Sequence, residues 1–162
     1  MVAITSAAFS VDALYGDLVY RVPEDSDRRR RVGRVRYVVS TSVDPPAAQL
    51  DPIATVLAQT FRLRDIGVHA YTQVLPVEPH PAGFSTGREN AYFNAVTAAA
   101  AVDAARDLIR LVRDKPGTNS SVRRWQTARS AYFARVEVEE ASRAALPPVV
   151  PAAGWTLPKE LL

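Results

Sequence analysis

Residues 86–112 read TGRENAYFNAVTAAAAVDAARDLIRLV, and this stretch has the clearest helical pattern in the chain. Thr86 and Glu89 have the spacing of a capping box, in which the two side chains cap each other's backbone amides. Lys115-Pro116-Gly117 ends the pattern. The apolar residues recur every three or four positions and therefore share one side of an α-helix: Tyr92, Ala95, Val96, Ala99, Val102, Ile109 and Val112.

Two helical patterns precede the first strong break in the chain, at Pro45-Pro46. Residues 4–20 predict a helix that stops before Pro23. A second pattern starts near Asp25 or Ser26. Because it is rich in valine, this segment fits a strand as well as a helix.

A further helix is predicted from Asp51 to about His69. Asp51 fits an N-cap, and Pro52 then occupies the first helical position. The segment from Leu75 to Gly87 is rich in proline and glycine and predicts a loop.

The last helix is expected to begin at Ser120 or Ser121 and to stop before Pro147. We find no internal repeat, and five helices without a convincing sheet predict an all-α bundle of four to five helices. We expect one helical domain over residues 1–146, followed by an extended Pro-rich tail over residues 147–162.

The chain of 162 residues contains no cysteine and only two histidines, His69 and His80. The lack of cysteine excludes disulfides, thiolate metal sites and thiol nucleophiles. Two histidines cannot form a three-histidine metal site within one chain. We expect neither a metal nor another cofactor. Of the 20 basic residues only Lys115 and Lys159 are lysines. A GC-rich genome explains most of this arginine bias, and recognition of phosphate is the functional alternative.

The sequence has no run of about 18 uncharged apolar residues, the length that a membrane span requires. Residues 1–11 are uncharged, but no basic residue precedes them and Asp12 and Asp17 follow, unlike a signal peptide. We expect a cytoplasmic protein without a membrane partner.

Two short motifs imitate catalytic or metal sites. Residues 83–87 match the G-x-S-x-G pattern of a nucleophile elbow, which requires a buried strand before Ser85 and a helix after it. A proline-rich loop precedes the motif here, so we interpret it as a glycine-flanked helix cap. Asp25 and Asp27 could bind a metal, but acidic residues at a helix start are explained by the helix dipole.

Residues 62–71, RLRDIGVHAY, are the most informative for function. Gly67 lies within a helical pattern at a cost of about 1 kcal/mol relative to alanine, which indicates close approach of another backbone. Five helical steps separate Arg64 and His69 by about 140°, so one helix does not present both on one face. Two copies of the helix across a twofold axis would bring them together. The alternative is that both cations complement the carbonyls at a helix end.

The segment from Arg64 to His69 resembles the R-x4-6-H motif of the HEPN superfamily (higher eukaryote and prokaryote nucleotide-binding domains). Tyr71 extends the match to the R-x4-H-x-Y form of HEPN toxins that are paired with nucleotidyltransferase antitoxins. The resemblance implies a HEPN-like fold and a metal-independent endoribonuclease that acts as a homodimer, either as a toxin or in phage defence. It makes Arg64 and His69 the catalytic pair, with Asp65 orienting the arginine or the RNA and Tyr71 lining the cleft. The loop after Tyr71, the last helix and the tail exceed the minimal toxin.

The implied chemistry needs no metal. An imidazole with a pKa of about 6.5 can exchange protons with RNA oxygens at neutral pH, and a guanidinium can stabilise charge on the scissile phosphate. A run of arginines is expected to contact the RNA backbone: Arg28, Arg29, Arg30, Arg31 and Arg34, with Arg36 as a further member. The alternative is a solvated helix face balanced by nearby acidic residues.

Two other functions remain open at this point. One is a non-catalytic HEPN-like module that binds a nucleotide or a partner protein. The other is a structural helical subunit in which Arg64 and His69 are ordinary surface residues.

Overall fold

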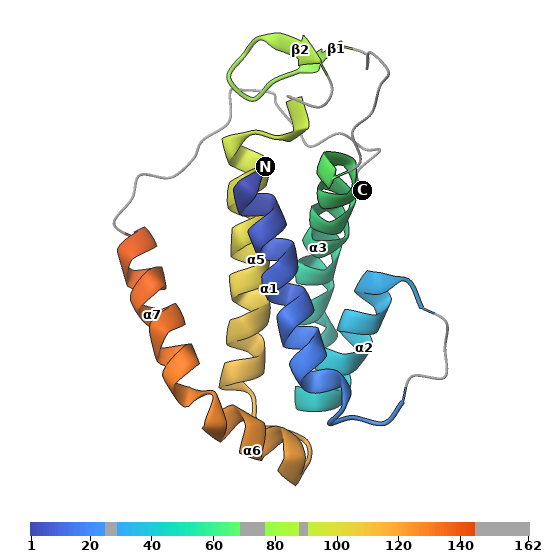
Figure 1. The fold of residues 1–162 in the computed structure, drawn as a ribbon, viewed down its shortest axis with the longest axis vertical. Helices are drawn as coiled ribbons and strands as arrows, with labels where there is room; N and C mark the ends of the chain where they lie inside the picture. The colour runs from blue at the N-terminus through green and yellow to red at the C-terminus, as the bar shows by residue number, and fades with distance from the viewer. Residues whose placement is uncertain (25–28, 69–76, 88–90, 145–162) are drawn as a thin grey trace.

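The structure is a computed structural model, and it describes residues 1–24, 29–68, 77–87 and 91–144 (Figure 1). The described chain is mostly helical and is packed as a bundle, so the prediction of an all-α fold is confirmed. Six helices are described, one more than expected: α1 (Val2–Val19), α2 (Arg31–Val43), α3 (Ala47–Val68), α5 (Ala95–Asp114), α6 (Ser120–Ala128) and α7 (Ser130–Ala144).

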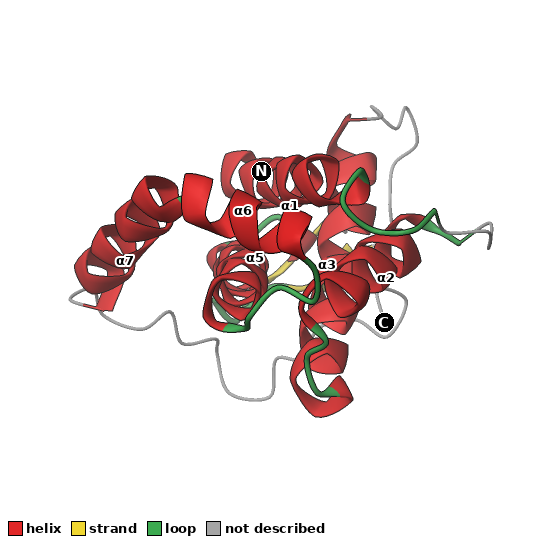
Figure 2. Cartoon of the chain, turned by 90° about the horizontal axis from the view of Figure 1, so that it is seen from below, coloured by secondary structure: helices red, strands yellow, loops and turns green. Residues whose placement is uncertain are grey.

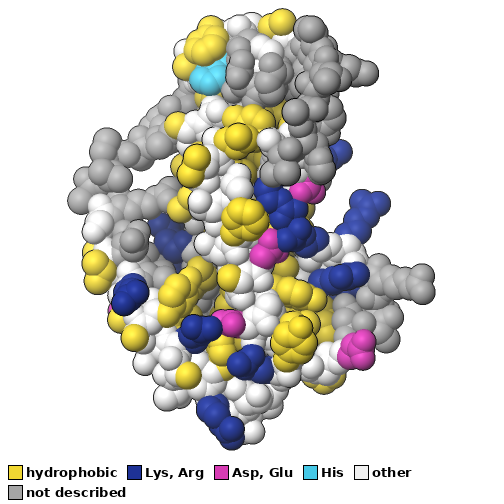
Figure 3. All heavy atoms as spheres, viewed as in Figure 1, with side chains coloured by type: hydrophobic (Ala, Val, Ile, Leu, Met, Phe, Trp, Pro, Cys, Tyr) yellow, Lys and Arg dark blue, Asp and Glu magenta, His cyan; other side chains and the backbone are white. Residues whose placement is uncertain are grey.

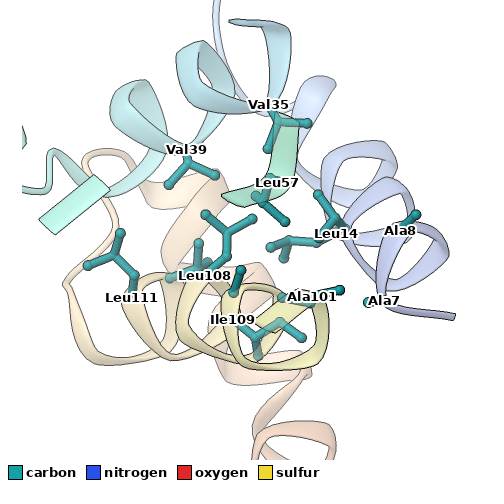
Figure 4. Close-up of a cluster of buried hydrophobic side chains, with 14 of the residues drawn as sticks. Ala7, Ala8, Leu14, Val35, Val39, Leu57, Ala101, Leu108, Ile109 and Leu111 are labelled. Carbon is teal, nitrogen blue, oxygen red and sulfur yellow. The ribbon is translucent and has the colours of Figure 1, made fainter. Parts of the chain in front are cut away.

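The core lies where α1, α3 and α5 meet, with α2 packed across α1 and α3 (Figure 1). Leu14, Leu57 and Leu108 point toward one another from these three helices (Figure 4). Each is at most 6% exposed. Burying one such side chain contributes about 1.5–3 kcal/mol, so these contacts set how the helices lie against one another.

The long helix α5 begins later than its pattern predicts. Asn94 is its N-cap and accepts hydrogen bonds from the amides of Val96 and Thr97 at 2.9 and 3.0 Å, while the Thr97 hydroxyl accepts from the Asn94 amide at 3.3 Å. Glu89 lies outside the described residues, so the capping box of Thr86 and Glu89 remains a prediction. Thr86 pairs with a neighbouring strand, and Asn94 with Thr97 forms a capping box of its own.

The buried side of α5 also differs from the predicted one. Ile109 and Val112 are buried as expected, but Ala95 is exposed. Because α1 and α3 pack against α5 from two directions, small residues between the predicted positions enter the core as well: Ala101, Ala104 and Ala105.

Helix α3 starts at Ala47, four residues before the predicted N-cap Asp51, and contains Pro52. Proline has no amide hydrogen, so near the start of the helix it removes one hydrogen bond without ending the helix. The amides of Gln49 and Leu50 donate to the Pro46 carbonyl at 2.9 and 3.2 Å and close the first turn. The end of α3 at Val68 agrees with the predicted end near His69.

The valine-rich segment is a helix, α2, and not a strand. It begins at Arg31, and Arg30 is its N-cap in extended conformation. The predicted helix start near residue 25 is therefore too early, because Arg29 and Arg30 are not helical. Asp44 ends it in a left-handed conformation, with φ of 43°. Asp25, Asp27 and Arg28 lie outside the described residues.

The predicted loop from Leu75 to Gly87 contains a small antiparallel hairpin of β1 (Val77–Pro79) and β2 (Ser85–Gly87). The rings of His80 and Phe84 stack within it, with centroids 4.4 Å apart. Ser85 thus lies in a two-stranded hairpin, which is unlike the strand–turn–helix setting of a nucleophile elbow.

The predicted last helix is two helices. Asn119, rather than a serine, caps α6 by accepting a hydrogen bond from the Val122 amide at 2.9 Å, and the chain turns at Arg129 before α7. Helix α7 stands apart from the other helices (Figure 2). The proposed boundary at residue 146 and the tail over residues 147–162 lie outside the described residues.

Helix α1 is long and apolar enough to cross a membrane by length and composition, with a mean hydropathy of 1.3 over 18 residues. The sequence-based expectation considered only uncharged runs and therefore passed over this segment, which contains Asp12 and Asp17. One third of the helix is buried in the bundle, including Ile4, Val11 and Leu18. Core helices of soluble proteins and N-terminal signal sequences both pass the same test. The cytoplasmic location remains a prediction.

Candidate functional site

Arg64 lies near the carboxyl end of α3, where its side chain is 11% exposed. Its Nη1 donates a hydrogen bond to Asp12 Oδ2 of α1 at 3.4 Å. Its Nε donates to Asp65 Oδ1 at 3.0 Å, and its Nη2 contacts the same oxygen. Two carboxylates therefore hold the guanidinium that the motif predicts to be catalytic.

Asp12 is shared by a second arginine from another helix. Arg31, the first residue of α2, donates from Nε to Asp12 Oδ1 at 2.8 Å and also contacts Oδ2 through Nη2. One carboxylate on α1 thus connects α2 and α3. Arg31 is far more exposed than Arg64, at 47% of its side chain.

The ring of Phe61 is the second group that the two arginines share. The guanidinium carbons of Arg31 and Arg64 lie 4.7 and 5.3 Å from its centroid. The ring is buried, at 4% exposed, and its negative face attracts both cations. We call Asp12, Arg31, Phe61 and Arg64 the Asp12 cluster. In it one carboxylate and one aromatic ring hold two like charges close together.

A groove of about 550 Å³ opens beside the Asp12 cluster, between α1 and the start of α2. We call it the arginine groove, and its lining is mostly basic: Asp12, Tyr15, Arg29, Arg30, Arg31, Arg34 and Val35. Basic and acidic side chains gather side by side where α1 lies next to α2 (Figure 3). Its volume is within the range of about 300–1,000 Å³ that is typical of small-molecule sites.

Four of the five arginines expected to contact RNA line this groove: Arg29, Arg30, Arg31 and Arg34. The fifth, Arg28, lies outside the described residues. Arg36, the further member of the run, does not line the groove; it forms an ion pair with Asp51 of α3, with 2.6 Å between Nη2 and Oδ1. The side chains of Arg29 and Arg34 are also held locally. The Arg29 guanidinium lies 5.1 Å from the ring centroid of Tyr37, and Arg34 Nε donates to the Arg29 carbonyl at 3.0 Å.

The other predicted site residues are described only in part. Asp65 accepts a hydrogen bond from Arg64, and its orienting role remains a prediction. His69, Tyr71 and Arg28 lie outside the described residues, so the geometry of the catalytic pair remains a prediction.

Sequence reasoning missed Asp12, Tyr15 and Phe61. Of these three residues, only Asp12 has a signal in the sequence. It is a charged residue within an apolar helical segment, next to Val11, which is fully buried. An acidic residue within an apolar helix usually has a cationic partner in the folded protein.

Gly67 has a structural explanation that differs from the predicted one. A Cβ atom there would lie 2.7 Å from Met1 Sδ and 3.2 Å from Phe93 Cζ. The groups that approach Gly67 are therefore side chains of the same chain, and the expected approach of another backbone is not needed to explain the glycine.

In the described part of the chain, no three His, Cys, Asp or Glu side chains lie together as a metal-binding group. Comparisons of the chain with protein-family models, curated proteins and solved structures gave no match. Fold and site together define an all-α protein with a basic groove beside a mostly buried arginine.

Proposed function

We propose that the protein is a metal-independent endoribonuclease of HEPN type, which acts as a homodimer and binds RNA along the arginine groove. The observation that supports this proposal best is the Asp12 cluster. Arg64 is the predicted catalytic arginine and Arg31 a predicted RNA contact, and both touch Asp12 and Phe61. A phosphate near this cluster would meet both guanidinium groups.

The proposed reaction follows from the chemistry of the two predicted catalytic residues. His69 removes the proton of a ribose 2′-hydroxyl, the 2′-oxygen attacks the neighbouring phosphorus, and the 5′-oxygen leaves with a proton from the second His69 of the dimer. The products are a 2′,3′-cyclic phosphate and a 5′-hydroxyl. Arg64 keeps Asp12, exchanges Asp65 for the phosphate and stabilises its growing charge.

The test is cleavage of RNA by the purified protein in EDTA. We expect His69→Ala to lower the rate by about 10²- to 10⁴-fold, the usual effect of losing a proton-transfer group. His80→Ala is the matched control, because His80 lies in the β-hairpin and stacks on Phe84. Equal rates for the two variants, or a requirement for a divalent metal, would refute the proposal.

The biological setting that we propose is a toxin of a toxin–antitoxin pair or a component of phage defence. It rests on the resemblance through Tyr71, which also suggests a nucleotidyltransferase-type antitoxin as partner. Expression of the wild type should then arrest growth, while His69→Ala should not. Growth that is unaffected by either protein would count against this setting.

A second function is favoured by the burial of Arg64. With its side chain 11% exposed and bound by Asp12 and Asp65, Arg64 has the contacts of a residue that fastens α3 to α1. In that case the protein is a non-catalytic module that binds RNA, a nucleotide or a partner. It would bind RNA without cutting it, and His69→Ala would change nothing.

A further inference from the structure

The arginine groove has the size and charge of a site for one nucleotide. We propose that it binds the phosphate of a single ribonucleotide unit, and that this phosphate replaces Asp12 as the partner of Arg31. The proposal rests on the proposed function only where RNA is taken as the source of that phosphate. Free nucleotides carry the same chemistry and are distinguished by the experiment below.

The charge of the groove is strongly one-sided. Four arginines line it, and among the described lining residues Asp12 is the only carboxylate. Arginine forks bind phosphate oxygens in pairs, which makes such a cluster suited to a phosphate group. Within the described residues no carboxylate forms an ion pair with Arg30 or Arg34.

The start of α2 adds to this positive field. Arg30 is its N-cap, no side chain caps the first amides, and the first turn contains no acidic residue. The partial positive charge of a helix N-terminus favours an anion at the same place. This charge and the arginines of the groove therefore act on one ligand position.

Tyr15 gives the groove an apolar wall that could hold a base. It lines the groove from α1 and is partly buried against the core. Aromatic rings stack on nucleobases without strong sequence preference. A ribonucleotide, with both a phosphate and a base, fits this lining better than inorganic phosphate alone.

Asp12 competes with the phosphate for Arg31. Of the two arginines that it holds, Arg31 is 47% exposed and Arg64 only 11%. Arg31 can therefore turn toward a ligand while Arg64 keeps Asp12. It follows that removing the Asp12 charge should strengthen binding.

The experiment measures binding of adenosine monophosphate and of a twelve-nucleotide single-stranded RNA by calorimetry. We expect Arg34→Ala to weaken binding of the monophosphate about tenfold, the effect of losing one charge-assisted hydrogen bond. The matched control is Arg36→Ala on the same helix, because Arg36 pairs with Asp51 outside the groove. Thermal melting confirms that each variant is folded.

The Asp12 step has its own pair of variants. Asp12→Asn should bind the monophosphate several-fold more tightly, whereas Asp51→Asn, which also removes one negative charge, should not. Equal affinities of these two variants would overturn the role of Asp12 as competitor.

The remaining outcomes separate the groove from the nuclease. If RNA is cleaved but the monophosphate does not bind, or if Arg34→Ala binds like Arg36→Ala, the groove proposal is overturned and the nuclease stands. If the monophosphate binds in the groove and no RNA is cleaved, the groove stands and the nuclease fails. RNA that displaces the monophosphate identifies the strand as a source of the phosphate; RNA that does not displace it identifies free nucleotides.

Discussion

Arg64 on α3 and Asp12 on α1 lie 52 residues apart in the sequence and are joined by a hydrogen bond of 3.4 Å between Nη1 and Oδ2. The same carboxylate holds Arg31 at the start of α2. Three helices therefore meet at one negatively charged group, next to a groove that is otherwise basic. This arrangement makes Asp12 important both for the stability of the bundle and for what the groove binds.

Replacing Arg64 tests how far the Asp12 cluster stabilises the fold. We expect Arg64→Ala to lower the free energy of unfolding by about 2 kcal/mol, because charged hydrogen bonds in a mostly buried position are lost. Urea denaturation measures this change. Arg36→Ala, which breaks an ion pair between two half-exposed side chains, should change stability by less than about 1 kcal/mol. Similar losses in both variants would show that the cluster contributes no more than a surface pair.

The reason for Gly67 can be tested by comparison with a second helical glycine. Gly16→Ala in α1 should stabilise the protein by about 1 kcal/mol, since a Cβ there has no heavy atom within 4 Å. Gly67→Ala should gain less, because Met1 and Phe93 have to shift. The two unfolding curves decide this. A complete loss of folding or of dimer formation in Gly67→Ala would instead favour close approach of another backbone.

The cap of α5 gives a further prediction about stability. Asn94→Ala removes the side chain that accepts hydrogen bonds from two amides of the first turn, so stability should fall by about 1–2 kcal/mol. Thermal unfolding measures the loss. Thr86→Ala is the comparison, and if this variant were the more damaging, the capping box predicted from the sequence would be correct.

The salt dependence of RNA binding reports on phosphate contacts in the groove. For single strands each lost contact makes the negative slope of log K against log salt concentration shallower by about 0.7. Arg30→Ala and Arg34→Ala should each show this change, while Arg36→Ala should keep the wild-type slope. Fluorescence anisotropy at several salt concentrations measures it. Three identical slopes would mean that RNA does not use the groove.

The helices were predictable because the signal for each one lies within its own short segment of sequence. A repeat of apolar residues every three to four positions identifies α1 and α5 wherever they lie in the fold. The helix ends were less predictable, since neighbouring residues compete for them. Thr86 and Asn94 both suit a cap; in the structure Asn94 caps α5, and Thr86 lies in β2.

The candidate site was predictable only in part. The motif identified Arg64 and Asp65, and the arginine run identified four residues of the groove. Their common neighbours Asp12 and Phe61 carry no motif. A single carboxylate among helical residues gains meaning only when its partners are known.

The sequence by itself determined an all-α chain, a chain without thiols, and an arginine in a recognisable motif, because composition and helical periodicity are properties of short segments. The tertiary structure alone decided that Asp12, Arg31 and Arg64 form one cluster beside a basic groove. Contacts between residues 19 and 52 positions apart depend on how α1, α2 and α3 pack. That packing is set by burial of the whole core, with no single segment of the sequence determining it.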